Sequence, residues 1–236
     1  MFWNLSGGQA ARRFHPALSG DHPAMRRILL VGGAPRVQID AVRFLCVDAS
    51  GRTAVRLGQD LGAQGLSCDL LLSVDAEPGV PALRFASRQI LESSLKDWIG
   101  QNPDGVIVLS AAINDYERAS VERRQGENVE LCPANGKIPS KANEIIIRLR
   151  PASKVIDQLA SWGHRGPLVG FKYEDSATVL KSARELMVRT KAVFVVANSL
   201  CGTIQALVSA EKIQHCGDRE ELLKNLGQRV ATLAAT

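Results

Sequence analysis

The chain has 236 residues, of which 45 % are hydrophobic and 22 % charged, and its formal net charge is +5. This apolar content excludes a disordered or low-complexity chain, and the length fits one large α/β domain or two small ones. The modest positive charge suits phosphorylated ligands as well as a plain solvated surface, and it does not indicate nucleic-acid binding.

Residues 1–24 contain Arg12, Arg13 and two prolines but no apolar stretch of the length that a secretory signal requires. We expect them to form a flexible extension, followed by a single domain that runs from Met25 to residue 236.

The longest apolar runs, such as 192–197, are too short to cross a bilayer, so no membrane association is predicted. The five cysteines form no CxxC pair and the four histidines show no metal-ligand spacing, which predicts reduced thiols, a cytoplasmic location and no metal site.

Between residues 27 and 110, short apolar runs alternate with longer stretches of helical periodicity. The predicted elements are strands at 28–31, 68–74 and 105–110, and helices at 53–65 and 87–100. The buried face of the second helix is expected to carry Ile90, Leu91, Leu95 and Trp98. This β-α-β-α-β order predicts a parallel sheet with helices on both faces.

The middle of the chain departs from this pattern. Polar residues dominate 118–130 and Asn135-Gly136 is a turn dipeptide, so we expect 129–150 to form an extended arm or hairpin inserted between two halves of the sheet. Ser153 is a possible cap for a short helix that follows.

All the elements together predict a Rossmann-like three-layer α/β/α sandwich with a mostly parallel sheet. The remaining elements are strands at 167–171 and 192–197, helices at 177–190 and 219–235, and an antiparallel pair at 203–208 and 211–215.

Candidate ligand-binding residues follow the predicted strands, because open parallel sheets bind ligands at the carboxyl ends of their strands. Gly32 and Gly33 follow the first strand, and Ser50-Gly51 opens a helix whose backbone N–H groups could approach a phosphate. Taken singly, each candidate fits a turn, a cap or a solvated lysine as well as it fits a binding site. The other candidates are Ala111, Ala112 and Asp115 after the third strand, Lys137 on the arm, and Asn198 after the last parallel strand.

The order of these motifs is more informative than any one of them. From residue 27 to the C-terminus this order resembles the phosphopantothenate–cysteine ligase family, whose domain is also called the DNA/pantothenate metabolism flavoprotein domain. The Gly-Phe-Lys at 170–172 is more similar to stand-alone bacterial ligases than to the domain fused to a decarboxylase. The motifs that carry the resemblance are Gly32-Gly33, Ile39-Asp40-Ala41-Val42-Arg43, Ser50-Gly51, Ala-Ala-x-x-Asp-Tyr from 111, Lys137-Ile138, Gly170-Phe171 and Ala197-Asn198.

The resemblance implies a ligase that joins 4′-phosphopantothenate to cysteine on the path to coenzyme A. Ligases of this family activate the carboxylate with CTP or ATP and Mg²⁺, form an acyl-nucleotide intermediate and release pyrophosphate. They are homodimers in which the arm reaches towards the partner subunit. Such chemistry requires no nucleophilic side chain and no resident metal, because positioning and charge neutralisation are sufficient.

The resemblance also implies roles for particular residues. Arg43, Lys137 and Asp115 match positions expected to act in catalysis, and Arg43 and Asn198 match positions that contact the acyl substrate. Arg189 is expected to replace lysines that fused ligases carry on the late helix. Nucleotide contacts are implied for Gly32, Gly33, Ser50, Gly51, Ala111, Ala112, Asp115, Lys137, Ser153, Lys154, Val155, Ile156, Phe171 and Arg189.

One departure from the family pattern concerns the chemistry directly. The family has asparagine, which contacts the activated acyl group, at the position of Val47. Valine cannot donate that hydrogen bond, and the neighbouring Asp48 would repel an acyl oxyanion or a phosphate. A catalytically altered, nucleotide-binding relative of the ligases is therefore an alternative. Another alternative is an NAD(P)-dependent Rossmann oxidoreductase, because residues 28–33 open like one, although the chain has no GxGxxG and no Tyr-x-x-x-Lys.

Overall fold

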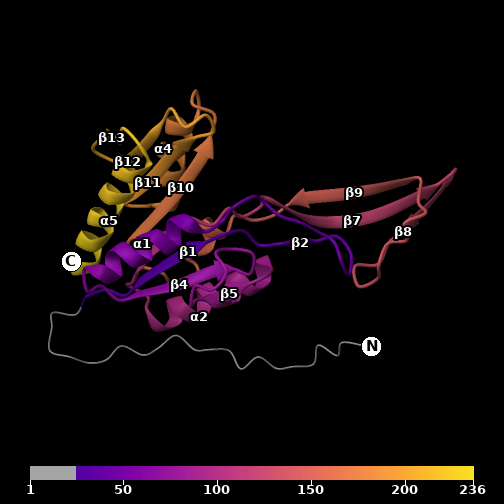
Figure 1. Ribbon diagram of the computed structural model, residues 1–236, viewed down its shortest axis with the longest axis horizontal. Helices are drawn as coiled ribbons and strands as arrows, with labels where there is room; N and C mark the ends of the chain where they lie inside the picture. The colour runs from indigo at the N-terminus through magenta and orange to yellow at the C-terminus, as the bar shows by residue number, and fades with distance from the viewer. Residues whose placement is uncertain (1–24) are drawn as a thin grey trace.

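The computed structural model describes residues 25–236, and the extension expected at 1–24 lies outside these described residues. Its centre is an eight-stranded sheet with the order β13-β12-β11-β10-β6-β1-β4-β5 (Figure 1). The six strands from β5 to β11 are parallel, whereas β12 and β13 are antiparallel to their neighbours, which confirms the predicted sheet. The strands are β1 Ile28–Gly32, β4 Cys68–Ser73, β5 Leu83–Phe85, β6 Val106–Leu109, β10 Leu168–Glu174, β11 Phe194–Ser199, β12 Gln205–Ser209 and β13 Ile213–His215.

Helices cover both faces of the sheet, as predicted. They are α1 Arg52–Ala63, α2 Arg88–Gln101, α3 Val155–Gln158, α4 Val179–Thr190 and α5 Arg219–Ala235. Successive residues of β1 point to opposite faces: Leu29 and Val31 join a cluster with α2 and α4, and Ile28 and Leu30 join one with α1 and α5. Burial on both faces explains the uninterrupted apolar sequence of this strand. No helix within residues 25–236 has the length and apolar character needed to cross a membrane.

Helix α2 corrects one prediction about the core. Ile90 is 45 % exposed, whereas Ile99 is buried beside Leu91, Leu95 and Trp98. The buried stripe thus begins at Leu91 and repeats at i+4, i+7 and i+8, and Ile90 lies about 100° away from Leu91 around the helix axis.

A three-stranded antiparallel arm projects from the sheet (Figure 1). Its strands are β7 Tyr116–Gln125, β8 Asn128–Leu131 and β9 Glu144–Pro151. The predicted start of the arm at 129 is wrong, because β7 begins at Tyr116. β7 lacks the alternating apolar pattern of a half-buried strand, and its charges instead pair across the arm, where Arg148–Glu122 and Arg150–Glu117 each lie 2.8 Å apart.

A buried carboxylate joins the arm to a turn between two short strands, β2 Val37–Gln38 and β3 Phe44–Leu45. Asp40 is fully buried and accepts hydrogen bonds from the backbone N–H groups of Val42, Arg43 and Ile138 at 2.8, 2.7 and 3.0 Å. Arg43 Nη1 also donates to it at 2.9 Å. Desolvation opposes ionisation, but the three backbone donors lower the pKa of Asp40 below its usual value.

The substitution Asp40→Asn should destabilise the fold at neutral pH, because a neutral amide is a weaker acceptor for these donors. The stabilisation from the carboxylate is complete above its unfolded-state pKa of about 3.9, and it is lost as the pH falls through the lower folded-state pKa. The stability difference between wild type and variant should therefore be constant above about pH 5 and shrink below about pH 4.

Urea unfolding over this pH range measures that difference. Asp60→Asn, which changes a partly exposed carboxylate paired with Arg56 on α1, is the control and should have little effect. A destabilisation by Asp40→Asn that does not depend on pH would contradict the role assigned to the charge.

Candidate functional site

A cleft lies at the carboxyl ends of the parallel strands, where the strand order reverses between β1 and β6. It has two adjoining compartments of about 460 and 450 Å³. The first, called the polar compartment, is lined by Gly33, Ser50, Gly51, Arg52, Ser199, Leu200, Gly202 and Gln205. The second, called the apolar-walled compartment, is lined by Val47, Arg88, Leu109, Ala111, Ala112, Ile113, Asn114, Asp115, Lys154, Val155, Ile156, Phe171, Lys172, Leu186 and Arg189. Both share Asp48, Ala49, Thr53, Ser110, Tyr173, Asn198 and Arg219.

The N-terminus of α1 opens into the polar compartment. Its N-cap residue Gly51 has a φ of 76° and provides no side-chain cap, and the nearby Ser50 hydroxyl lies 3.4 Å from the Arg52 N–H. Gly33, with a φ of 85°, borders the same space. Because uncapped N–H groups at a helix N-terminus attract anions, this end of the cleft suits a phosphate.

The apolar-walled compartment combines an apolar surface with paired charges. Lys154 Nζ lies 2.9 Å from Asp115 Oδ2, and Arg189 Nε lies 3.0 Å from Asp157 Oδ1. Such solvent-exposed pairs contribute little to stability, so a bound polyphosphate can draw the cations away from their partners. No group of three or more His, Cys, Asp or Glu side chains suited to a metal ion occurs in the part of the chain that the structure describes.

The structure brings twelve of the sixteen predicted site residues together in this cleft. They come from the segments that follow β1 and β6, from within β10 and β11, from the N-terminal ends of α1 and α3, and from α4. The twelve are Gly33, Ser50, Gly51, Ala111, Ala112, Asp115, Lys154, Val155, Ile156, Phe171, Arg189 and Asn198.

Gly32 and Ser153, two of the other four, do not line the cleft. A β-carbon at Gly32 would lie 2.8 Å from Ala54 Cβ, so this glycine permits close contact between β1 and α1 and does not border the cleft. Ser153 is not a helix cap, contrary to the prediction: the N-cap of α3 is Lys154, without a side-chain bond. The Ser153 hydroxyl accepts instead from Gln158 Nε2 at 2.7 Å.

Arg43 and Lys137 also lie away from the cleft of their own chain. The Arg43 guanidinium is bound to Asp40, and its Nη2 lies 3.5 Å from the carbonyl oxygen of Ile138, in the loop between β8 and β9. Lys137 borders a separate pocket of about 240 Å³ on the arm, together with Glu130.

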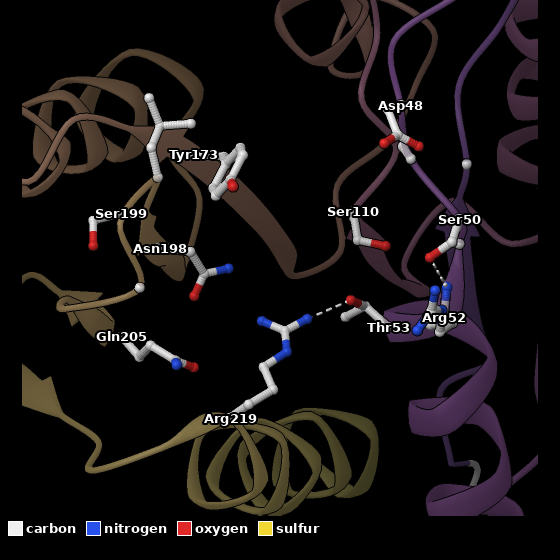
Figure 2. A pocket seen from close by; sticks show the side chains of 15 residues that line it. Asp48, Ser50, Arg52, Thr53, Ser110, Tyr173, Asn198, Ser199, Gln205 and Arg219 are labelled. Atoms are coloured by element: carbon white, nitrogen blue, oxygen red, sulfur yellow. Dashed lines mark hydrogen bonds between the residues drawn. The ribbon is translucent and has the colours of Figure 1, made fainter.

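Sequence reasoning missed Arg219, which lines both compartments and is drawn in Figure 2. Its Nη2 donates to Thr53 Oγ1 at 2.5 Å, and burial lowers its pKa. One feature of the sequence could have indicated Arg219. It directly follows the helix cap Asp218, at a position where the helix dipole disfavours positive charge. Tyr173, Gln205 and Ser110 are further lining residues that the motifs did not indicate.

Val47, the position at which the resembled family has asparagine, lies at the cleft. Its side chain is 40 % exposed and borders the apolar-walled compartment beside Asp48. The position therefore faces the cleft, and a hydrogen-bond donor placed there would reach the same space.

A family model and one relative each match most of the chain. The family model of the DNA/pantothenate metabolism flavoprotein C-terminal domain matches residues 24–231. The chain is 27 % identical over 199 residues to the coenzyme A biosynthesis bifunctional protein CoaBC of Thermococcus kodakarensis. That match covers 80 % of this chain and 44 % of the relative, so the chain spans less than half the length of that protein.

Solved structures share the fold at low sequence identity. The DNA/pantothenate metabolism flavoprotein from Streptococcus pneumoniae has a TM-score of 0.73 and 19 % identity, over 89 % of this chain and 99 % of that one. A mutant of Cab2 in complex with phosphopantothenate-cysteine has a TM-score of 0.69 and 16 % identity, over 88 % and 85 %. The C-terminal domain of a bifunctional CoaBC has a TM-score of 0.66 and 17 % identity, over 88 % and 95 %.

Proposed function

The chain belongs to the DNA/pantothenate metabolism flavoprotein C-terminal domain family, and from this we propose that it is a ligase that joins 4′-phosphopantothenate to cysteine. The observation that carries the proposal is the cleft, which collects twelve residues that the sequence motifs indicate. The relative with 27 % identity is named for coenzyme A biosynthesis, and family membership favours a ligase over the NAD(P)-dependent alternative.

The proposed reaction has two steps. The carboxylate of 4′-phosphopantothenate attacks the α-phosphorus of CTP or ATP, which releases pyrophosphate and leaves an acyl-nucleotide. The amine of cysteine then attacks the acyl carbon, loses a proton and displaces the nucleoside monophosphate. Mg²⁺ arrives with the triphosphate and neutralises part of its charge, while cations and backbone N–H groups of the protein hold the reacting groups in place. We place this reaction in the cytoplasm, where the nucleotide and reduced cysteine are available.

The two compartments provide different surfaces for the substrates. We assign the nucleoside to the apolar-walled compartment, where Val155, Ile156 and Phe171 offer an apolar surface for the base and Asp115 can accept hydrogen bonds from the sugar. Asn198 lies at the border of the polar compartment, from which it would contact the acyl substrate.

We further propose that Arg43 and Lys137 act in the cleft of a partner subunit in a homodimer. Both lie at or near the arm and outside the cleft of their own chain. The arm carries the surface that a partner would bury, because Ile145, Ile147 and Leu149 on one edge strand are 37, 38 and 39 % exposed.

Ile147→Asp should convert the proposed homodimer into monomers, because it places a charge in an apolar interface. We expect the dissociation constant of the dimer to rise by about 100-fold. Light scattering should give twice the 25.5 kDa chain mass for the wild type and that mass for the variant. Val188→Asp, at a 75 % exposed site on α4, is the matched control and should remain dimeric. A monomeric wild type, or a variant of unchanged mass, would contradict this arrangement.

Pyrophosphate release tests the ligase proposal. The purified chain is incubated with 4′-phosphopantothenate, cysteine, Mg²⁺ and either CTP or ATP, and each component is omitted in turn. Release that requires phosphopantothenate and one of the nucleotides supports the proposal and identifies the nucleotide. The absence of release with both nucleotides, together with nucleotide binding by calorimetry, would defeat it.

That outcome would favour a second candidate, a nucleotide-binding relative without ligase activity. Val47 is the observation behind it, because its side chain borders the cleft and cannot donate the hydrogen bond that asparagine gives in the ligases that this chain resembles. Binding of NADH without binding of CTP would instead favour the oxidoreductase.

A further inference from the structure

Arg219 is a cation in the cleft for which the proposed reaction has so far given no role. It occupies the first turn of α5 and donates one hydrogen bond, from Nη2 to Thr53 Oγ1. An arginine has five N–H donors, so most of them are available to a ligand. Within residues 25–236, no carboxylate forms an ion pair with this guanidinium.

The position of this cation is unfavourable for folding. A helix N-terminus carries a partial positive charge, so a cation in the first turn lowers helix stability, whereas Glu220 and Glu221 in the same turn raise it. Partial burial of Arg219 without a carboxylate partner adds a desolvation cost. A bound anion would offset both costs, which gives a physical reason for an arginine at this site.

Other donors converge on the same space. Figure 2 shows the Arg219 side chain pointing from α5 into the polar compartment, between Gln205 and the start of α1. On the α1 side lie the hydroxyls of Thr53 and Ser50 and the first-turn N–H groups behind Gly51. These donors and the guanidinium surround a volume that suits the three oxygens of a phosphate group.

The side-chain amides of Asn198 and Gln205 line the opposite side of the compartment (Figure 2). Asn198 Oδ1 and Gln205 Oε1 are buried and have no hydrogen-bond partner among the described residues. Because these two oxygens are closed to solvent, a ligand in the compartment would meet the amide N–H groups of the same side chains, which donate hydrogen bonds.

We propose that Arg219 is the phosphate-binding residue of the polar compartment, and that the amide N–H groups of Asn198 and Gln205 donate hydrogen bonds to the same phosphate ester. This rests on the proposed ligase function, in which the acyl substrate and the nucleotide both carry phosphate. The apolar-walled compartment offers the surface that a base requires, so the 4′-phosphate of the acyl substrate is the favoured occupant.

Calorimetric titration of Arg219→Gln with 4′-phosphopantothenate, pantothenate and CTP tests the proposal. We expect phosphopantothenate to bind about 10- to 100-fold more weakly, while binding of pantothenate, which lacks the phosphate, changes less than about twofold. A loss of this size for CTP instead would assign Arg219 to the phosphates of the nucleotide. Arg165→Gln, at an exposed arginine that is paired with Asp104 and lines neither compartment, is the matched control and should leave all three affinities unchanged.

Unchanged affinity for both phosphorylated ligands, or an equal loss for pantothenate, would overturn the proposal, as would a wild type that binds neither phosphorylated ligand. Inorganic phosphate gives a second measurement on the wild-type chain, independent of how the variant folds. It should weaken the apparent binding of phosphopantothenate or of CTP but not that of pantothenate, and competition with neither would also overturn the proposal. Binding is measured without turnover, so a chain that binds both ligands but releases no pyrophosphate would refute the ligase function and leave this site standing.

Discussion

Val47→Asn should raise the rate of amide formation with cysteine by about 10²- to 10³-fold, the contribution typical of one donor to a developing oxyanion. The side chain at 47 borders the apolar-walled compartment and is 40 % exposed, so an amide there can reach a bound acyl group. In the wild type the neighbouring Asp48 cannot replace this donor, because its carboxylate accepts hydrogen bonds and repels negative charge.

Steady-state assays with saturating nucleotide measure this effect. Val193→Asn is the matched control, since Val193 is 44 % exposed and lies outside both compartments, and it should leave the rate unchanged. An unchanged or lower rate for Val47→Asn, with substrate binding intact, would show that residue 47 does not contact the acyl group.

Gly33→Ala should both destabilise the fold and weaken ligand binding. A β-carbon at Gly33 would lie 2.1 Å from Ser73 Oγ and 2.8 Å from Ser73 Cβ, and the φ of 85° is itself unfavourable for alanine. We expect a loss of about 2–5 kcal/mol in the free energy of unfolding, from backbone strain and overpacking together. Because the Gly33 carbonyl accepts the Ala112 N–H at 2.9 Å, displacement of this turn should also disturb the apolar-walled compartment.

Gly79→Ala separates the two causes. Gly79 has the same φ of 85°, but no atom lies within 4 Å of a β-carbon built there. Urea unfolding should therefore show only the strain, about 1–2 kcal/mol, and CTP binding should be unaffected. Equal destabilisation by the two substitutions would show that the close approach to Ser73 is unimportant.

The buried strands and long helices could be predicted because their signals are local. Four consecutive apolar residues at 28–31 are typical of a strand covered on both faces, and α5 spans the predicted 219–235. The motifs at strand ends likewise indicated most of the cleft, since parallel strands bring their carboxyl ends to one edge of a sheet.

What could not be predicted depends on contacts between distant segments. Asp40 binds the backbone of Ile138, 98 residues away, and Arg219 binds Thr53, 166 residues away. Neither pair leaves a periodic pattern in the sequence. The sequence pattern also did not predict β7. Its charged residues look like those of a solvated loop, but in the fold they pair with charges on the neighbouring strands of the arm.

Transfer of a labelled oxygen tests the central claim most directly. With ¹⁸O in both carboxylate oxygens of 4′-phosphopantothenate, attack on the α-phosphorus and displacement by cysteine should move one labelled oxygen into the nucleoside monophosphate and leave the other in the amide. Mass spectrometry should then find one ¹⁸O in the released CMP or AMP and none in pyrophosphate. Label in inorganic phosphate, or amide formation without labelled nucleoside monophosphate, would contradict an acyl-nucleotide ligase.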